Sequence, residues 1–129
     1  MVPNLKCHVL VSLLAVVAFG VAARAESIEG MYRVEGTAPG ADEAYRGKAQ
    51  VKKTGATYTI VWQIGEGGHV GTGILTSDVL SIFFQPLDRR GAPGVASFRV
   101  IEGKITGGTW SVLGGNAVGD ERWVPDRGI

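Results

Sequence analysis

The chain has 129 residues, 13 of them Lys or Arg and 12 Asp or Glu, for a net charge of +1. This balance gives no electrostatic basis for binding nucleic acid or an anionic membrane surface. Cys7 is the one cysteine in the sequence, which excludes an intrachain disulfide and a cysteine-rich zinc site. We therefore expect no nucleic-acid partner, no cofactor and no bound metal.

The first 25 residues have the pattern of a secretory signal. Lys6 precedes an apolar run, 9–23, which ends at Ala23-Arg24-Ala25 with small residues where a signal peptidase reads. The alternative is a membrane anchor, but the run of about 15 residues is shorter than the roughly 20 that span a bilayer as a helix. We expect residues 1–25 to be removed, without stable membrane insertion afterwards, and the product to be periplasmic or secreted.

Residues 26–129 are expected to form one domain with a net charge of about −1, because the leader contains two basic residues and no acidic one. Glycines punctuate this domain, and short runs rich in Val, Ile, Thr, Tyr, Phe and Trp lie between them. The alternation of apolar and polar residues in these runs predicts strands, and no window has a helical period. Eight strands are expected: 30–36, 45–53, 57–64, 69–75, 79–84, 94–101, 104–112 and 119–124.

One expected strand, 104–112, has an irregular pattern. Ile105 and Trp110 are five residues apart, which would place their side chains on opposite faces of a regular strand. Gly107 and Gly108 lie between them and predict a β-bulge, which would turn both apolar side chains to the same face.

Short turns and the absence of a crossover helix predict an antiparallel meander. Eight such strands close into a barrel that is either filled by side chains or able to hold one small ligand. Closure also removes exposed strand edges, which would otherwise pair with other chains. The expected fold is therefore a small all-β barrel, with a two-sheet β-sandwich as the alternative.

Five residues are candidates for ligand binding: Tyr32, Trp62, Trp110, Glu121 and Trp123. Glu121 lies two residues before Trp123, so the two share one face of the last strand, and Glu121 points inward if Trp123 does. A carboxylate inside a barrel needs partners, so Glu121 is either a ligand contact or a member of a structural salt bridge or hydrogen-bond group. The aromatic residues either line a pocket or fill the core. If the barrel closes, Tyr32 and Trp123 become neighbours.

The remaining polar residues do not form a catalytic pattern. His69 is the one histidine of residues 26–129 and follows a glycine-rich turn, so we expect it at the surface. No nucleophile-elbow motif accompanies it, and no catalytic residue is assigned. The longest expected loop, 85–93, contains Arg89 and Arg90, which form either a solvated tip or a contact for a protein partner.

A series of short segments resembles a known family of proteins. These segments are Gly30–Thr37, Tyr45–Gly47, Trp62–Gly65, Gly71–Gly73, Asp78–Leu80, Thr109–Trp110 and Gly119–Trp123. Together they resemble a family of small exported β proteins of alphaproteobacteria, some of which carry the label "fibronectin-binding protein". The resemblance extends over nearly all of residues 29–124 and implies a shared fold.

These observations favour an exported, non-enzymatic binding module of the bacterial envelope, which binds a small apolar ligand or a protein partner. One alternative is a barrel-type enzyme that uses Glu121 and a neighbouring arginine in the barrel mouth. Others are a periplasmic inhibitor and a structural envelope protein. An enzyme should bring polar residues together in the barrel, whereas a protein binder should have a closed apolar barrel and exposed loop residues.

Overall fold

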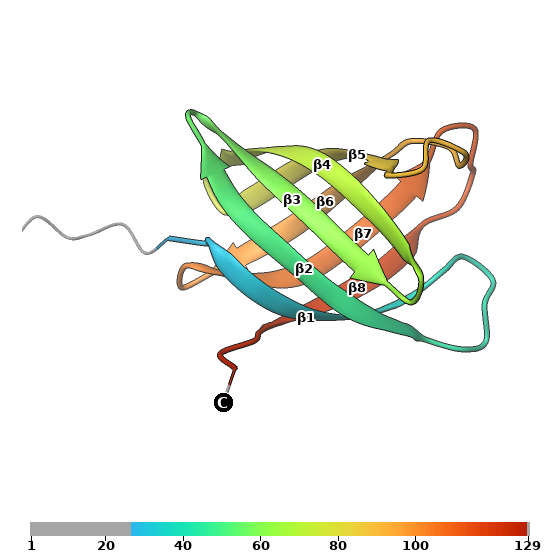
Figure 1. The fold of residues 1–129 in the computed structure, drawn as a ribbon, viewed down its shortest axis with the longest axis horizontal. Helices are drawn as coiled ribbons and strands as arrows, with labels where there is room; N and C mark the ends of the chain where they lie inside the picture. Colours follow the sequence, from blue (N-terminus) through green and yellow to red (C-terminus); the bar gives the residue numbers. More distant parts are fainter. Residues whose placement is uncertain (1–26, 129) are drawn as a thin grey trace, which may run out of the picture.

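The computed structural model describes residues 27–128, which form eight antiparallel strands (Figure 1). The strands are β1 (Gly30–Thr37), β2 (Tyr45–Thr54), β3 (Thr57–Ile64), β4 (Gly67–Thr76), β5 (Val79–Pro86), β6 (Gly94–Ile101), β7 (Lys104–Val112) and β8 (Gly119–Pro125). Each strand pairs with the next, and β8 pairs with β1 to close the barrel. The predicted meander barrel is confirmed, and the sandwich alternative is wrong. The expected signal segment, 1–25, lies outside the described residues.

The turns follow from their residue types. Gly55, between β2 and β3, has a φ of 61°, a conformation that glycine adopts at no steric cost. Glu102 and Gly103 have φ values of 51° and 73°, as a two-residue hairpin between β6 and β7 requires. Strand β5 extends two residues beyond its expected end because Pro86 still pairs with His69 of β4.

The predicted bulge in β7 is confirmed. The pairing of β6 with β7 passes from Arg99–Gly107 directly to Val100–Ile105, which leaves Thr106 without a cross-strand partner. The Thr106 hydroxyl donates a hydrogen bond of 3.1 Å to the carbonyl of Arg99 and secures the irregular segment. Ile105 is thereby directed into the barrel, where it is fully buried.

The two ends of the barrel differ in their connections. At one end the strands are joined by three long loops, 38–44, 87–93 and 113–118, and by one two-residue turn, 65–66. At the other end the connections are two-residue turns, at 55–56, 77–78 and 102–103. We call these the loop end and the turn end; the loop end lies at the right in Figure 1.

The interior toward the turn end is filled with apolar side chains. Ile60, Leu80 and Ile105 are completely buried there, and Ile28, which precedes β1, is almost completely buried. The Tyr32 hydroxyl donates a hydrogen bond of 2.8 Å to the Ile28 carbonyl, so the polar tip of this buried ring has a partner. These side chains belong to a hydrophobic core that continues toward the loop end through Trp62 and Phe98, and its burial stabilises the domain.

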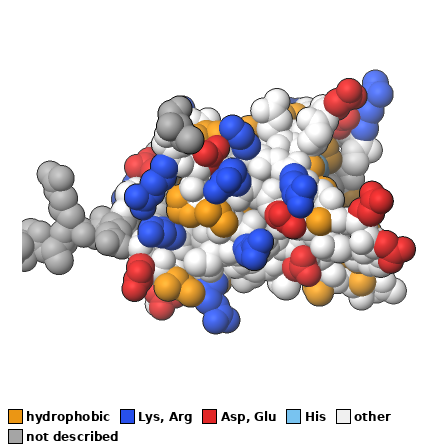
Figure 2. Space-filling model, turned by 90° about the horizontal axis from the view of Figure 1, so that it is seen from below, with side chains coloured by type: hydrophobic (Ala, Val, Ile, Leu, Met, Phe, Trp, Pro, Cys, Tyr) orange, Lys and Arg blue, Asp and Glu red, His pale blue; other side chains and the backbone are white. Residues whose placement is uncertain are grey.

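The outer surface beside β1 and β2 carries charges of both signs. Glu35 pairs with Arg46 and Lys48 with Asp126, each at 3.3 Å on the outer surface, where the Arg46 and Lys48 side chains are exposed to solvent, so each pair contributes little to stability. Lys, Arg, Asp and Glu side chains are interspersed in the view from below in Figure 2. Among the described residues, no helix is long and apolar enough to cross a bilayer.

Candidate functional site

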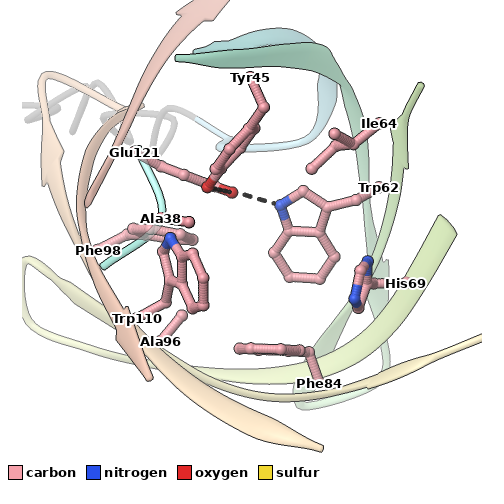
Figure 3. Close-up of a pocket in the computed structure, with 10 residues that line it drawn as sticks. All are labelled: Ala38, Tyr45, Trp62, Ile64, His69, Phe84, Ala96, Phe98, Trp110 and Glu121. Atoms are coloured by element: carbon pink, nitrogen blue, oxygen red, sulfur yellow. Dashed lines mark hydrogen bonds between the residues drawn. The ribbon is translucent and has the colours of Figure 1, made fainter. Parts of the chain in front are cut away.

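The interior toward the loop end is hollow. A cavity of about 290 Å³ lies there, and Figure 3 shows ten lining residues. They are Ala38, Tyr45, Trp62, Ile64, His69, Phe84, Ala96, Phe98, Trp110 and Glu121. An apolar protein cavity of about 150 Å³ is large enough to bind benzene. The space is therefore sufficient for one small organic molecule.

Glycines in the barrel wall make room for the aromatic rings around the cavity. Gly36 of β1 lies opposite Tyr45 of β2, and a Cβ atom on Gly36 would stand 2.4 Å from the Tyr45 ring. Gly94 of β6 has the same relationship with Phe84 of β5, again at 2.4 Å. An aromatic ring that lies across a glycine of the neighbouring strand covers the exposed backbone. The rings therefore lie along the wall and leave the centre open (Figure 3).

Glu121 is the one carboxyl group on the cavity wall, and only 9% of it is exposed. Its Oε1 accepts a hydrogen bond of 2.8 Å from the Tyr45 hydroxyl. Its Oε2 accepts a hydrogen bond of 2.7 Å from Trp123 Nε1 and another of 3.4 Å from Trp62 Nε1. Figure 3 shows Glu121 with Tyr45 and Trp62. Burial raises the pKa of Glu121, whereas these three donors oppose that rise by stabilising the carboxylate. Glu121 thus belongs to a hydrogen-bond group, one of the alternative roles expected for it.

Tyr45 is held in its protonated form by the same environment. Burial raises the pKa of its hydroxyl, and the nearby charge of Glu121 raises it further. Tyr45 therefore remains a hydrogen-bond donor at any physiological pH. The Tyr45 ring also packs against Trp110, with ring centroids 6.4 Å apart. Among the described residues, Trp110 Nε1 is the one buried side-chain nitrogen or oxygen without a hydrogen-bond partner.

The prediction that His69 lies at the surface is wrong. His69 is half-buried, lines the cavity and meets the Phe84 ring edge to face at 5.7 Å. Burial lowers the pKa of its imidazole, and Asp88 partly opposes this effect. The ring is therefore neutral near pH 7. Its position follows from the strand period, because His69 lies two residues before the inward-facing Gly71.

The structure brings three of the five candidate ligand residues to one cavity: Trp62, Trp110 and Glu121. The other two candidates, Tyr32 and Trp123, do not line this cavity. Strand β1 runs toward the loop end and β8 runs away from it. Tyr32, early in β1, and Trp123, late in β8, consequently lie in the filled half, where their rings pack at 5.3 Å. Trp123 still supports the site through its hydrogen bond to Glu121.

Tyr45 is not among the five candidates that the sequence indicates. It is the first residue of its strand, and the sequence gives no sign of its bond to Glu121, which is 76 residues away. Its position opposite Gly36 could have indicated a ring on the inner wall, but only the barrel closure brings β2 near β8. The same closure places Trp62 beside Glu121.

Arg89 and Arg90 are exposed in loop 87–93, away from the cavity wall. The backbone at Arg89 has a φ of 60°, and the amide of Arg90 donates a hydrogen bond of 3.0 Å to Asp88. Leu87, in the same loop, is also exposed. Within residues 27–128, no cluster of His, Cys, Asp and Glu side chains could hold a metal ion.

No family model, no curated protein and no solved structure matches this chain. The chemistry of the site therefore has to be argued from its own residues. The cavity wall combines one carboxyl, one phenol and one imidazole with aromatic and aliphatic side chains. This composition, mostly apolar with a few placed polar groups, is typical of a small-molecule site.

Proposed function

We propose that the protein is an exported binding module that takes one small, largely apolar molecule into the loop end of its barrel. The observation that carries this proposal is the hollow half of the barrel, which is walled by aromatic rings although buried apolar side chains fill the interior toward the turn end. Small barrels filled throughout by side chains leave no such space. The mostly apolar wall would release water on binding, which favours an apolar ligand.

The enzyme alternative lacks the arrangement that it requires. A reaction at Glu121 was expected to use a neighbouring arginine, but the ten residues on the cavity wall include neither arginine nor lysine. Tyr45 and His69 are the other titratable groups there, and Tyr45 is bound to Glu121 as a donor. No observation on this wall favours catalysis over binding.

The proposal is tested by tryptophan fluorescence of purified residues 26–129 during titration with a panel of small apolar and amphipathic molecules. Two of the three tryptophans, Trp62 and Trp110, line the cavity, so an occupant should change their emission. We expect a saturable change with at least one member of the panel. The absence of any response, with a crystal structure whose loop end is filled by side chains, would refute the proposal.

A matched pair of variants locates the binding. Ala96 faces the cavity from β6, whereas its neighbour Ser97 faces solvent. Ala96→Leu should fill part of the cavity and weaken binding, and Ser97→Leu should leave the affinity unchanged. Equal effects of the two substitutions would place the ligand outside the barrel.

A second candidate function is binding of a protein partner through the loops. Leu87 and Leu113 are exposed at the loop end, Leu113 by 76%, and Arg89 and Arg90 lie near Leu87 in the same loop. Arginine is enriched in protein contact surfaces, and the two exposed leucines add apolar area at the same end of the barrel. The family resemblance suggests fibronectin as the first partner to test. Immobilised fibronectin should retain the wild type more strongly than a Leu87→Ser, Leu113→Ser variant, and equal retention would refute this candidate.

A further inference from the structure

The cavity contains an acidic group without a basic partner. The ion pairs among the described residues are Glu35–Arg46 and Lys48–Asp126, both on the outer surface. Glu121 therefore has no described cation within ion-pair distance. The one basic side chain among the ten lining residues is His69, which burial keeps neutral near pH 7. A buried carboxylate without a cation is costly to maintain.

The hydrogen bonds of Glu121 nevertheless suit its charged form. All three donors are neutral, and the indole groups of Trp62 and Trp123 can only donate. Oε2 accepts both of these bonds. A proton on Oε2 would find no acceptor in either indole, so this pair of donors favours the ionised carboxylate. The protein thus presents dipoles that stabilise a negative charge on Glu121 but provides no positive charge to balance it.

The aromatic wall adds a second feature that favours a cation. The faces of tryptophan, tyrosine and phenylalanine rings carry negative electrostatic potential and attract cations, most strongly where water is excluded. Trp62, Phe84, Trp110 and Tyr45 surround the open centre of the cavity together with Glu121 (Figure 3). A charged amine placed there would contact both the carboxylate and the rings.

The number of free acceptor positions narrows the shape of the cation. A carboxylate offers about four positions for hydrogen bonds, and three are occupied: one on Oε1 and two on Oε2. The one that remains, on Oε1, can face either a single N–H donor or the positively charged methyl groups of a quaternary ammonium ion. A guanidinium group binds a carboxylate through two parallel bonds, which this arrangement does not allow.

We infer that the ligand of the barrel is a small organic ammonium ion, whose apolar body fills the aromatic cavity and whose charged nitrogen lies beside Glu121. This inference rests on the proposed function and specifies its ligand class. A neutral apolar molecule of the same shape would satisfy the cavity but leave the carboxylate without a cation. A guanidinium compound would satisfy the charge but not the hydrogen-bond geometry.

The test compares two molecules that differ in charge but hardly in shape. Benzyltrimethylammonium is permanently cationic, and neopentylbenzene replaces its nitrogen with carbon. Calorimetric titration of residues 26–129 should show the cation binding about tenfold more tightly. A cation–π contact shielded from water contributes roughly the free energy of one tenfold step in affinity. Preference for neopentylbenzene would overturn the ammonium inference and leave the proposed function intact. Failure of both probes would also overturn it, and the fluorescence panel would then decide the proposed function separately.

Substitution of the carboxyl group should remove the discrimination. In Glu121→Gln the affinity for benzyltrimethylammonium should fall about tenfold, whereas neopentylbenzene should bind as before. Glu66→Gln is the matched control. Glu66 is exposed in the turn at the loop end, so its substitution makes the same change of charge outside the cavity. An equal loss in the two variants would indicate long-range attraction and overturn the contact with Glu121.

A pH titration of the wild type keeps the test valid if Glu121→Gln folds poorly. Benzyltrimethylammonium does not titrate, so pH dependence must arise from the wall groups Glu121, Tyr45 and His69 or from Asp88 and Asp120 beside them. Its affinity should rise with pH as Glu121 ionises and then level off, and His69→Gln should retain this rise. An affinity that falls with rising pH would overturn the inference.

Discussion

The indole ring of Trp110 lies against Gly119, its cross-strand partner in β8. A Cβ atom on Gly119 would stand 2.5 Å from the ring, a distance at which one of the two groups must move. Tyr45 and Gly36 have the same relationship. Glycine therefore determines where the rings of the cavity wall rest, and the volume of the cavity depends on residues that have no side chain.

Gly119→Ala should push the Trp110 ring toward the centre of the cavity. We expect the free energy of unfolding to fall by about 1–3 kcal/mol, the usual cost of added atoms in a packed site. Ligand affinity should fall in addition, because the displaced ring occupies the space that a ligand needs. Urea unfolding and fluorescence titration measure the two effects separately.

Gly67→Ala is the control for this substitution. Gly67 is exposed at the start of β4, and the nearest atom to its added Cβ would be 3.6 Å away. Both stability and affinity should remain close to the wild type. If Gly119→Ala behaves like Gly67→Ala, Trp110 is free to rearrange and does not define the wall.

Tyr45→Phe removes the hydroxyl that donates to Glu121 Oε1 and keeps the ring over Gly36. The pKa of Glu121 should rise further, because the lost bond stabilises the carboxylate. The loss of stability should be about 1.5–3 kcal/mol where Glu121 is ionised, as for other hydrogen bonds to charged groups. A carbon-detected NMR titration of the Glu121 carboxyl measures the pKa, and an unchanged value would contradict the bond.

The pH dependence of stability should carry opposite contributions from two cavity residues. Burial raises the pKa of Glu121, so its favourable contribution is complete at low pH and is lost as pH rises through the folded-state pKa. Burial lowers the pKa of His69, so its contribution is present above its ordinary pKa and is lost as pH falls. Urea unfolding should be measured across about pH 3–8, the range in which Glu and His titrate. As pH rises, the free energy of unfolding of Glu121→Gln should increase relative to that of the wild type.

His69→Gln provides the complementary measurement. Its stability should gain on that of the wild type as the medium becomes more acidic, because the substitution removes a buried group that would otherwise take up a proton on unfolding. Parallel pH curves for the wild type and both variants would mean that neither side chain is buried as the structure places it.

The fold was predictable because each strand carries its own local signal. The alternation in Thr57–Ile64 gives the buried and exposed faces directly, and Gly107 and Gly108 indicate the bulge in β7. These features depend on residues within a few positions of one another. Closure of the barrel follows from the number of strands and the short turns between most of them.

The site was only partly predictable because it depends on depth along the barrel axis. Alternation places Tyr32 and Trp62 on the inward face but does not say which of them lies at the loop end. That position follows from the strand direction together with the position within the strand. The surface prediction for His69 failed because β4 begins at Gly67, two residues before its expected start, so His69 lies within the paired strand and on the same face as Gly71.

The expected leader gives a prediction about processing. Ala23-Arg24-Ala25 should be the cleavage site, so the exported protein should begin at Glu26. Intact-mass measurement of protein recovered from the periplasm or medium tests this, with an Ala25→Arg variant as the control that should block cleavage. A membrane-retained product that still contains residues 1–25 would contradict it.

The last prediction concerns which tryptophans sense a ligand. Trp62 and Trp110 line the cavity, whereas Trp123 is only 2% exposed and lies in the filled half behind Glu121. In a Trp110→Phe variant the ligand-induced change in fluorescence should shrink, because one of the two reporters on the wall is lost. In Trp123→Phe most of the change should remain, although the affinity should fall because Glu121 loses its shortest hydrogen bond. If instead Trp123→Phe abolishes the signal and Trp110→Phe preserves it, the ligand occupies the turn end and the assignment of the hollow half is wrong.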